Sequence, residues 1–236
     1  MKVLTVYLRL YLECLQKAFR GIRKNLWTLA LPMGIALAWG ASLVIASQLG
    51  MIGGIVMGLA MAALGSCYLY FVSDVVAGTP VKLQELKRSV GTYFWAVINV
   101  MFIFWIARLA VSLLGGAQAG VLLRAINVVA LIAFNAVPET LYLRGTHGGM
   151  ATLQESFEFL RDQLLPWAVP NVLLIAAVWG LPQGLGRLGL PGSLTLLVYA
   201  LLVGALVHVA MVFRGHLYKA LSGSSHRQRM FRYGER

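Results

Sequence analysis

The stretch 27-WTLALPMGIALAWGASLVIASQLGMIGGIVMGLAMAALGSCYLYFVSDVVA-77 decides the fold, because it holds two long apolar runs in direct succession. The runs 27–48 and 49–77 each reach the roughly 20 residues that a helix needs to cross the hydrocarbon core of a bilayer. Neither run alternates between apolar and polar residues, which disfavours membrane-spanning β-strands. We therefore expect a hairpin of two transmembrane helices.

Four further apolar windows continue the pattern, at 93–115, 119–143, 165–181 and 190–213. The third of these four is short and contains Pro170, so we expect it to tilt or kink. Hydrophobic residues make up 59% of the 236 residues and charged residues only 12%, which argues against a soluble domain and against a disordered chain. The sequence predicts an all-α integral membrane protein whose six transmembrane helices form three hairpins.

Small residues recur at every fourth position in the first two spans. This spacing keeps small side chains on one helix face, where two backbones can approach closely. We expect the face to pack the first hairpin together, with homodimerisation through the second helix as the alternative. The residues are Gly34, Ala38 and Ser42 in the first span, and Gly50, Gly54, Gly58, Ala62 and Ser66 in the second.

The distribution of basic residues predicts the orientation in the membrane. With six spans both termini lie on one side, and 17 of the 20 basic residues fall on that side, against Arg187 alone on the other. Basic segments stay in the cytoplasm, so we expect a bacterial inner-membrane protein with both termini cytoplasmic. The net charge of +12 would then attract anionic headgroups of membrane lipids. Nucleic acid is not an expected partner, because the basic residues lie close to the span ends.

Three segments outside the spans are amphipathic, and each precedes one hairpin. In residues 1–25, apolar side chains recur at helical spacing opposite a basic face, which is typical of a helix lying in the membrane interface. Segments 81–91 and 150–163 show the same interleaving of apolar and charged residues. We therefore divide the chain into an interfacial helix (1–25), a six-span domain (26–221) and a basic cytoplasmic tail (222–236).

Polar residues inside the spans are the candidate functional residues. In the fourth span, Arg124, Asn127, Asn135 and Glu139 are spaced to share one helix face, and the nearby Pro138 predicts a kink. Arg108 lies at a similar depth in the third span. Neither arginine has a carboxylate at its depth, so we expect an anion there: a lipid phosphate, a substrate's phosphate or carboxylate, or a partner's acidic residue. The alternative is that both arginines extend to the outer headgroups or bind backbone carbonyls.

The sequence offers little for catalysis. It has no phosphate-binding Gly-x-x-x-x-Gly-Lys-Ser/Thr loop and no His-Glu-x-x-His zinc motif, and its four histidines are scattered. Cys14 and Cys67 are not expected to meet. We expect no catalytic residue, no metal site and no cofactor, hence no enzyme.

Two functions fit this layout. The layout resembles that of the membrane subunits of ABC-2-type exporters. It has six spans, an N-terminal interfacial helix, two cytoplasmic termini and a cytoplasmic helix after the second span. That resemblance implies a homodimeric permease driven by a separate ATPase, which would dock on segment 81–91. The alternative is a non-transporting scaffold, assembly or lipid-binding subunit beside other membrane proteins, which requires no continuous polar pathway.

Overall fold

The structure is a computed structural model of the chain, and it describes residues 2–145, 148–186 and 191–234. Every regular element in these ranges is helical. Three short 3-10 turns occur at Leu26–Ala30, Leu83–Glu85 and Gly116–Gln118. The α-helices are α1 (Lys2–Lys24), α2 (Leu31–Ser47), α3 (Met51–Ala77), α4 (Leu86–Thr92), α5 (Phe94–Leu114), α6 (Ala119–Ala133), α7 (Val137–Arg144), α8 (Gly149–Gly186), α9 (Gly192–Ser222) and α10 (His226–Gly234).

Five of the helical segments are long and apolar enough to cross a membrane. They are Leu26–Ser47, Ile52–Ala77, Phe94–Leu114, Gly149–Pro182 and Gly192–Ser222. The pair α6 and α7 would form a sixth span, bent by 42° at a short break. The chain is therefore all-helical, with the five or six apolar helices of a multi-pass membrane protein.

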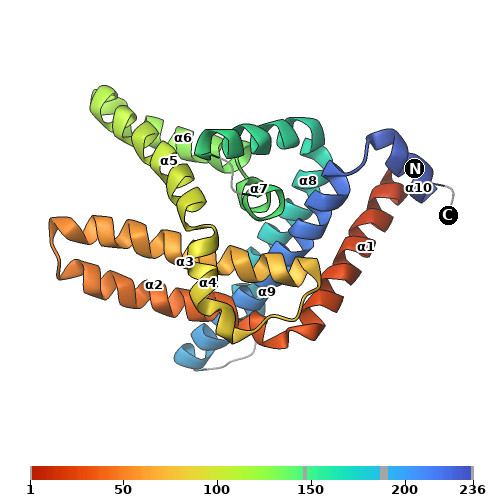
Figure 1. Cartoon of the computed structure of the whole chain (residues 1–236), viewed down its shortest axis with the longest axis horizontal. Helices are drawn as coiled ribbons and strands as arrows, with labels where there is room; N and C mark the ends of the chain where they lie inside the picture. Colours follow the sequence, from red (N-terminus) through yellow and green to blue (C-terminus); the bar gives the residue numbers. More distant parts are fainter. Residues whose placement is uncertain (1, 146–147, 187–190, 235–236) are drawn as a thin grey trace.

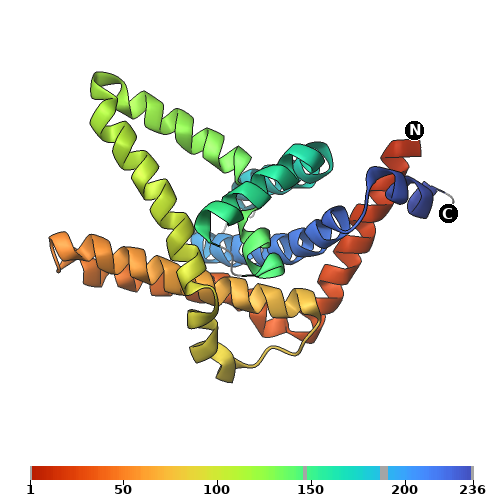
Figure 2. The same cartoon turned by 45° about the horizontal axis from the view of Figure 1, so that its top comes forward.

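Helix α9 holds the arrangement together, because it contacts α1, α2, α3, α7 and α8. Around it the chain forms a packed base, which we define as residues 2–25, 66–104, 136–145, 148–167 and 208–234. Two hairpin arms extend from the base: the first arm is 31–65 and the second arm is 105–133. Figures 1 and 2 show both arms pointing away from α1 and α10 and diverging from each other.

The hydrophobic core lies almost entirely in the base. The largest side chains with almost no exposed surface include Trp167, Phe71, Leu10 and Leu217, all of them base residues. The arms instead expose large apolar side chains along their length, such as Leu37 and Ile55 on the first and Leu113 on the second. Arms of this kind suit lipid or another protein as their surroundings, and not water.

Helix α1 buries one face against the protein. Its buried residues recur every fourth position, which places them on a single stripe. The stripe faces α9, α3 and α10, whereas the apolar residues Val3, Leu4 and Leu8 stay exposed. The buried residues are Val6, Leu10, Cys14, Ala18 and Ile22.

The basic C-terminal segment folds back as helix α10. Ser225 and Gln228 start the helix with reciprocal bonds, since the Gln228 side chain accepts from the Ser225 N–H (2.8 Å) and the Ser225 hydroxyl accepts from the Gln228 N–H (3.2 Å). Tyr233 then connects α10 to α1: its hydroxyl donates to Glu13 (2.9 Å), and its carbonyl accepts from Arg9 (2.8 Å). Residues 226–234 are thus part of the base, and Figure 1 shows the two ends of the chain side by side.

The other two amphipathic segments are helical over part of their length. Segment 81–91 contains a 3-10 turn followed by the short helix α4, which packs on α3 and α5. Segment 150–163 is the first part of α8, and non-helical backbone at Gln163 (φ −126°, ψ 23°) separates it from the apolar part. Pro166 and Pro170 follow that kink inside the helix and remove two backbone donors from it.

A glycine outside the fourfold spacing lies against the opposite helix beside the hairpin turn. A Cβ atom built on Gly53 would clash with the carbonyl oxygen of Ala46, so only glycine fits there. The glycines Gly34, Gly54 and Gly58 lie away from this contact, because a Cβ atom on any of them would meet nothing within 4 Å. The same is true of Gly50, which has φ +54° in the turn. Contrary to the prediction, these four glycines therefore do not bring the two helix backbones of the hairpin together.

Asn25 joins α1, the start of the first span and the segment before α4. Its side-chain amide donates to the carbonyls of Gly21 (3.2 Å) and Thr79 (3.1 Å), and its side-chain oxygen accepts from the Val81 N–H (2.9 Å). Thr28 donates to the Asn25 carbonyl (2.7 Å) and lies 2.9 Å from the Nε2 atom of His208 on α9. Asn25 is only 3% exposed, so water cannot replace these partners.

Asn25→Ala should therefore destabilise the protein by about 1–3 kcal/mol, because the buried Val81 N–H and the buried Gly21 carbonyl lose their partners. The measurement is the free energy of unfolding in bicelles by steric trapping. Gln84→Ala is the control, since Gln84 is an exposed amide close by in the same segment. Equal stability of the two variants would contradict the role assigned to Asn25.

Candidate functional site

Helices α6 and α7 meet at a break over residues 134–136. Pro138 explains its position: a continuous α-helix would need a hydrogen bond from residue 138 to the carbonyl of Phe134, and proline has no N–H to donate. The Val137 N–H bonds to that carbonyl instead (3.1 Å), and α7 starts with proline in its first turn. The break bends the chain, so that α7 enters the base.

Glu139 and Arg214 form an ion pair inside the base. Glu139 has no exposed surface, and the Arg214 side chain on α9 is 14% exposed. The Nε atom of Arg214 lies 2.9 Å from Glu139 Oε1, and its Nη2 atom donates to Glu139 Oε2 (2.9 Å). Burial of a carboxylate is costly without such a partner, so the pair fixes α7 against α9.

Three further residues surround the ion pair. The Asn135 carbonyl, at the break, accepts a hydrogen bond from Arg214 Nη2 (2.6 Å). The Asn135 side chain accepts from the Trp167 indole N–H (3.0 Å), and the Arg214 guanidinium lies over the Trp167 ring, 5.0 Å from its centroid. Asn171, one turn along α8, donates to the Trp167 carbonyl (2.6 Å). Three helices, α7, α8 and α9, and the break before α7 thus converge on one charged pair.

A cavity of about 320 Å³ opens beside this cluster, between α8 and α9. Asn135, Asn171 and Arg214 provide its polar part. Its other walls are apolar, including Ile175, Trp179 and Met211. The cavity is therefore amphipathic, but Glu139 already neutralises the arginine at its polar end.

The structure brings together two of the five candidate residues of the spans. Asn135 and Glu139 meet at Arg214, whereas Arg124 and Asn127 lie on the far side of the break in α6 and are exposed. The polar residues of the fourth span therefore do not share one face as predicted, because the 42° bend interrupts the helical repeat on which that prediction depends. Arg108 is exposed in the last two turns of α5. Within the described ranges, the side chains of Arg108, Arg124 and Asn127 have no hydrogen bond or ion pair.

Sequence reasoning did not find the two residues that complete the cluster, Arg214 and Trp167. Arg214 follows the expected end of the sixth span by one residue and was counted with the cytoplasmic charges, but α9 continues to Ser222. The structure pairs this arginine with Glu139. The local sequence around Arg214 gives no signal, because a basic residue directly after an apolar run is typical of the cytoplasmic end of a span.

The described part of the chain shows no disulfide bond and no cluster of metal-ligating residues. Cys14 and Cys67 are both free and buried, and no three of the described His, Cys, Asp and Glu residues gather closely enough to hold a metal ion. Comparisons with protein-family models, with curated proteins and with solved structures found no match. The interpretation of this protein therefore depends on its own geometry.

The ion pair predicts a strong coupling between residues 139 and 214. Either Glu139→Gln or Arg214→Gln alone should destabilise the protein by about 3–5 kcal/mol, because each leaves an unpaired buried charge. The double variant should cost less than the sum of the two single variants, because it leaves neither charge.

A double-mutant cycle of unfolding free energies in bicelles measures this coupling. The exposed pair Arg161–Asp162 on α8, with side chains 66% and 60% exposed, is the control, changed to Gln and Asn. Its coupling should stay within about 1 kcal/mol of zero. Additive effects at residues 139 and 214 would show that the ion pair does not stabilise the fold.

Proposed function

We propose that this protein is a membrane subunit of a transport complex, of the permease type, and that its two arms pack against further subunits. One observation carries the proposal: Arg108 and Arg124 lie exposed on the apolar second arm and have no hydrogen-bonding or ionic partner in the described chain. Each arginine placed in hydrocarbon costs about 2.5–3.5 kcal/mol on insertion scales, and partners lower that cost. The partner has to come from outside this chain.

Both arginines occur near the tip of the second arm. Arg108 is in the last two turns of α5 and Arg124 in the second turn of α6, and these two helices contact each other. Around them the arm exposes Trp105, Leu109 and Leu122. A partner that matches this surface offers an apolar helix face with an acidic or phosphate group at the same depth, as a neighbouring subunit or a bound anionic substrate would.

The divergence of the two arms supports the same conclusion. The first and second arms leave the base in different directions (Figure 2), and both expose large apolar side chains. Exposed apolar surfaces of this size mark contacts with lipid or with another protein. A second copy of the chain or a different membrane subunit would cover them.

The opposite end of the molecule suits a cytoplasmic partner. We infer from the distribution of basic residues that the base faces the cytoplasm, with α1 at the lipid interface. The segment before α5 then presents Lys82, Lys87 and Arg88 to solvent. A separate ATPase could dock there, as the resemblance to ABC-2-type permeases implies.

A scaffold without transport activity is the second candidate. It is favoured by the break between α6 and α7, which separates Arg124 and Asn127 from Asn135 and Glu139. It is also favoured by Arg214, which neutralises Glu139. The polar groups of the fourth span therefore form two separate sites, and a scaffold needs no polar pathway between them.

Replacing both arginines by glutamine should reduce association with partners without reducing membrane insertion. In Arg108→Gln/Arg124→Gln we expect loss of about tenfold or more of the partner protein or anionic lipid that co-purifies, because two charge-assisted contacts disappear. The measurement is quantitative mass spectrometry of the tagged protein extracted into nanodiscs.

Arg20→Gln/Arg23→Gln removes the same charge from exposed positions of α1 in the base and serves as the control for the arm. A stoichiometric ATPase among the proteins that co-purify with the wild type supports the permease. Integral membrane partners without an ATPase support the scaffold. Unchanged partners and lipids in the arginine variant would overturn both forms of the proposal.

A further inference from the structure

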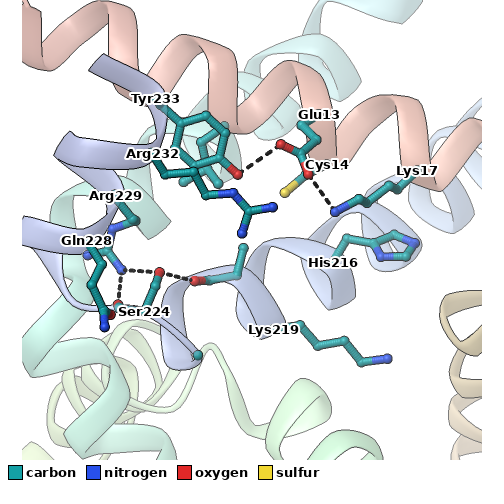
Figure 3. A pocket seen from close by; sticks show the side chains of 13 residues that line it. Glu13, Cys14, Lys17, His216, Lys219, Ser224, Gln228, Arg229, Arg232 and Tyr233 are labelled. Atoms are coloured by element: carbon teal, nitrogen blue, oxygen red, sulfur yellow. Dashed lines mark hydrogen bonds and ion pairs between the residues drawn. The ribbon is translucent and has the colours of Figure 1, made fainter. Parts of the chain in front are cut away.

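A cavity of about 420 Å³ lies in the base between α1, the end of α9 and α10. Figure 3 shows its charged side chains, which come from all three helices. Four of the lining residues are cationic, Lys17, Lys219, Arg229 and Arg232, and Glu13 is the only acidic one. The formal charge of the lining is therefore +3, and its volume lies within the range of small-molecule sites.

Two of the four cations are occupied by the protein. Lys17 donates to Glu13 (2.7 Å), one turn away on α1. Arg229 is 2% exposed and holds the end of α9: it donates to the carbonyls of Leu221 (3.1 Å) and Ser224, and to the Gln163 side chain (2.8 Å). Arg229 thus satisfies the exposed carbonyl end of the helix, which would otherwise repel an anion.

The other two cations are available to a ligand. Neither Lys219 nor Arg232 donates a side-chain hydrogen bond within the described ranges. Arg232 lies over the ring of Tyr233, 5.6 Å from its centroid, and Figure 3 shows its guanidinium reaching from α10 toward the space between α1 and α9. His216 adds an Nε2 atom that is buried without a hydrogen-bond partner among the described residues.

The remaining lining residues stabilise the walls. Lys17 and, to a smaller extent, Tyr233 donate hydrogen bonds to the Glu13 carboxylate and hold its pKa below the usual value, so Glu13 stays ionised and keeps α10 on α1. Burial raises the pKa of the Cys14 thiol to about 12, so this residue is a neutral part of the wall. Glu13 is thus used to hold α10 on α1, and Lys219 and Arg232 leave the cavity lining with an excess of positive charge.

We propose that this cavity binds a phosphate-bearing anion, held by Lys219 and Arg232 with His216 as a further hydrogen-bonding group. Arginine binds phosphate through two parallel hydrogen bonds, and lysine adds a point charge. The phosphate can belong to an anionic lipid headgroup or to a soluble phosphate. The site is separate from the arm arginines, so it does not depend on the transport proposal.

The test uses the full-length protein with two probes. For the lipid source, the protein is placed in phosphatidylcholine nanodiscs that contain phosphatidylglycerol, and the phosphatidylglycerol that stays bound is counted by native mass spectrometry. For the soluble source, inorganic phosphate is titrated in phosphatidylcholine nanodiscs without anionic lipid, and the shift in melting temperature is measured.

Lys219→Gln/Arg232→Gln should lower retention of phosphatidylglycerol, or the stabilisation by inorganic phosphate, by about tenfold or more in apparent affinity. Lys219→Arg/Arg232→Lys should keep binding close to that of the wild type, because it keeps both charges. Arg20→Gln/Arg23→Gln is the matched control, since it removes two exposed basic residues of α1 outside the cavity.

Loss with the lipid probe assigns the site to a headgroup, and loss with inorganic phosphate assigns it to a soluble phosphate. The proposal is overturned if the glutamine variant and the control lose binding equally, because general surface charge would then explain it. It is also overturned if the wild type binds neither probe. The charge-preserving variant shows whether a loss reflects charge or misfolding.

Discussion

A carboxylate with no exposed surface at Glu139 has to be neutralised, and this requirement organises the base. Arg214 reaches it from α9, the helix that contacts most of the others. The position of the carboxylate depends in turn on the break before Pro138, which redirects α7, and the same break supplies the Asn135 carbonyl to the guanidinium. Trp167 covers the arginine and connects α8. One backbone defect and one ion pair thus determine how α7, α8 and α9 meet.

Local pattern was enough to predict that the chain is helical and apolar enough to cross a membrane several times. Length and hydropathy are properties of each segment alone, so the long helices α3, α5 and α9 follow from their own residues. The polar face of the fourth span could not be predicted in the same way. Its spacing assumes an unbroken repeat of 3.6 residues, and a bend at residues 134–136 ends the register between Arg124 and Glu139.

The sequence could not predict contacts between segments that lie far apart in the chain. Glu139 and Arg214 are 75 residues apart, and Asn25 and Val81 are 56 apart. Nothing near Arg214 distinguishes an arginine that enters the bundle from one that stays at the end of a span. Composition also could not show how the basic C-terminal segment packs. Pairing of Tyr233 with Glu13 packs it as helix α10.

The molecule therefore has two ends with different physical needs. In the base, the buried charges of Glu139 and Arg214 are matched within the chain, and one cavity has a lining with an excess charge of +3. In the arms, apolar side chains and two arginines have no counterpart among the described residues. On the two proposals above, the partners of the arms enter from the membrane, and the anion enters the cavity of the base from the side of α1 and α10. Lateral assembly and anion binding could then occur together, because they would use separate surfaces.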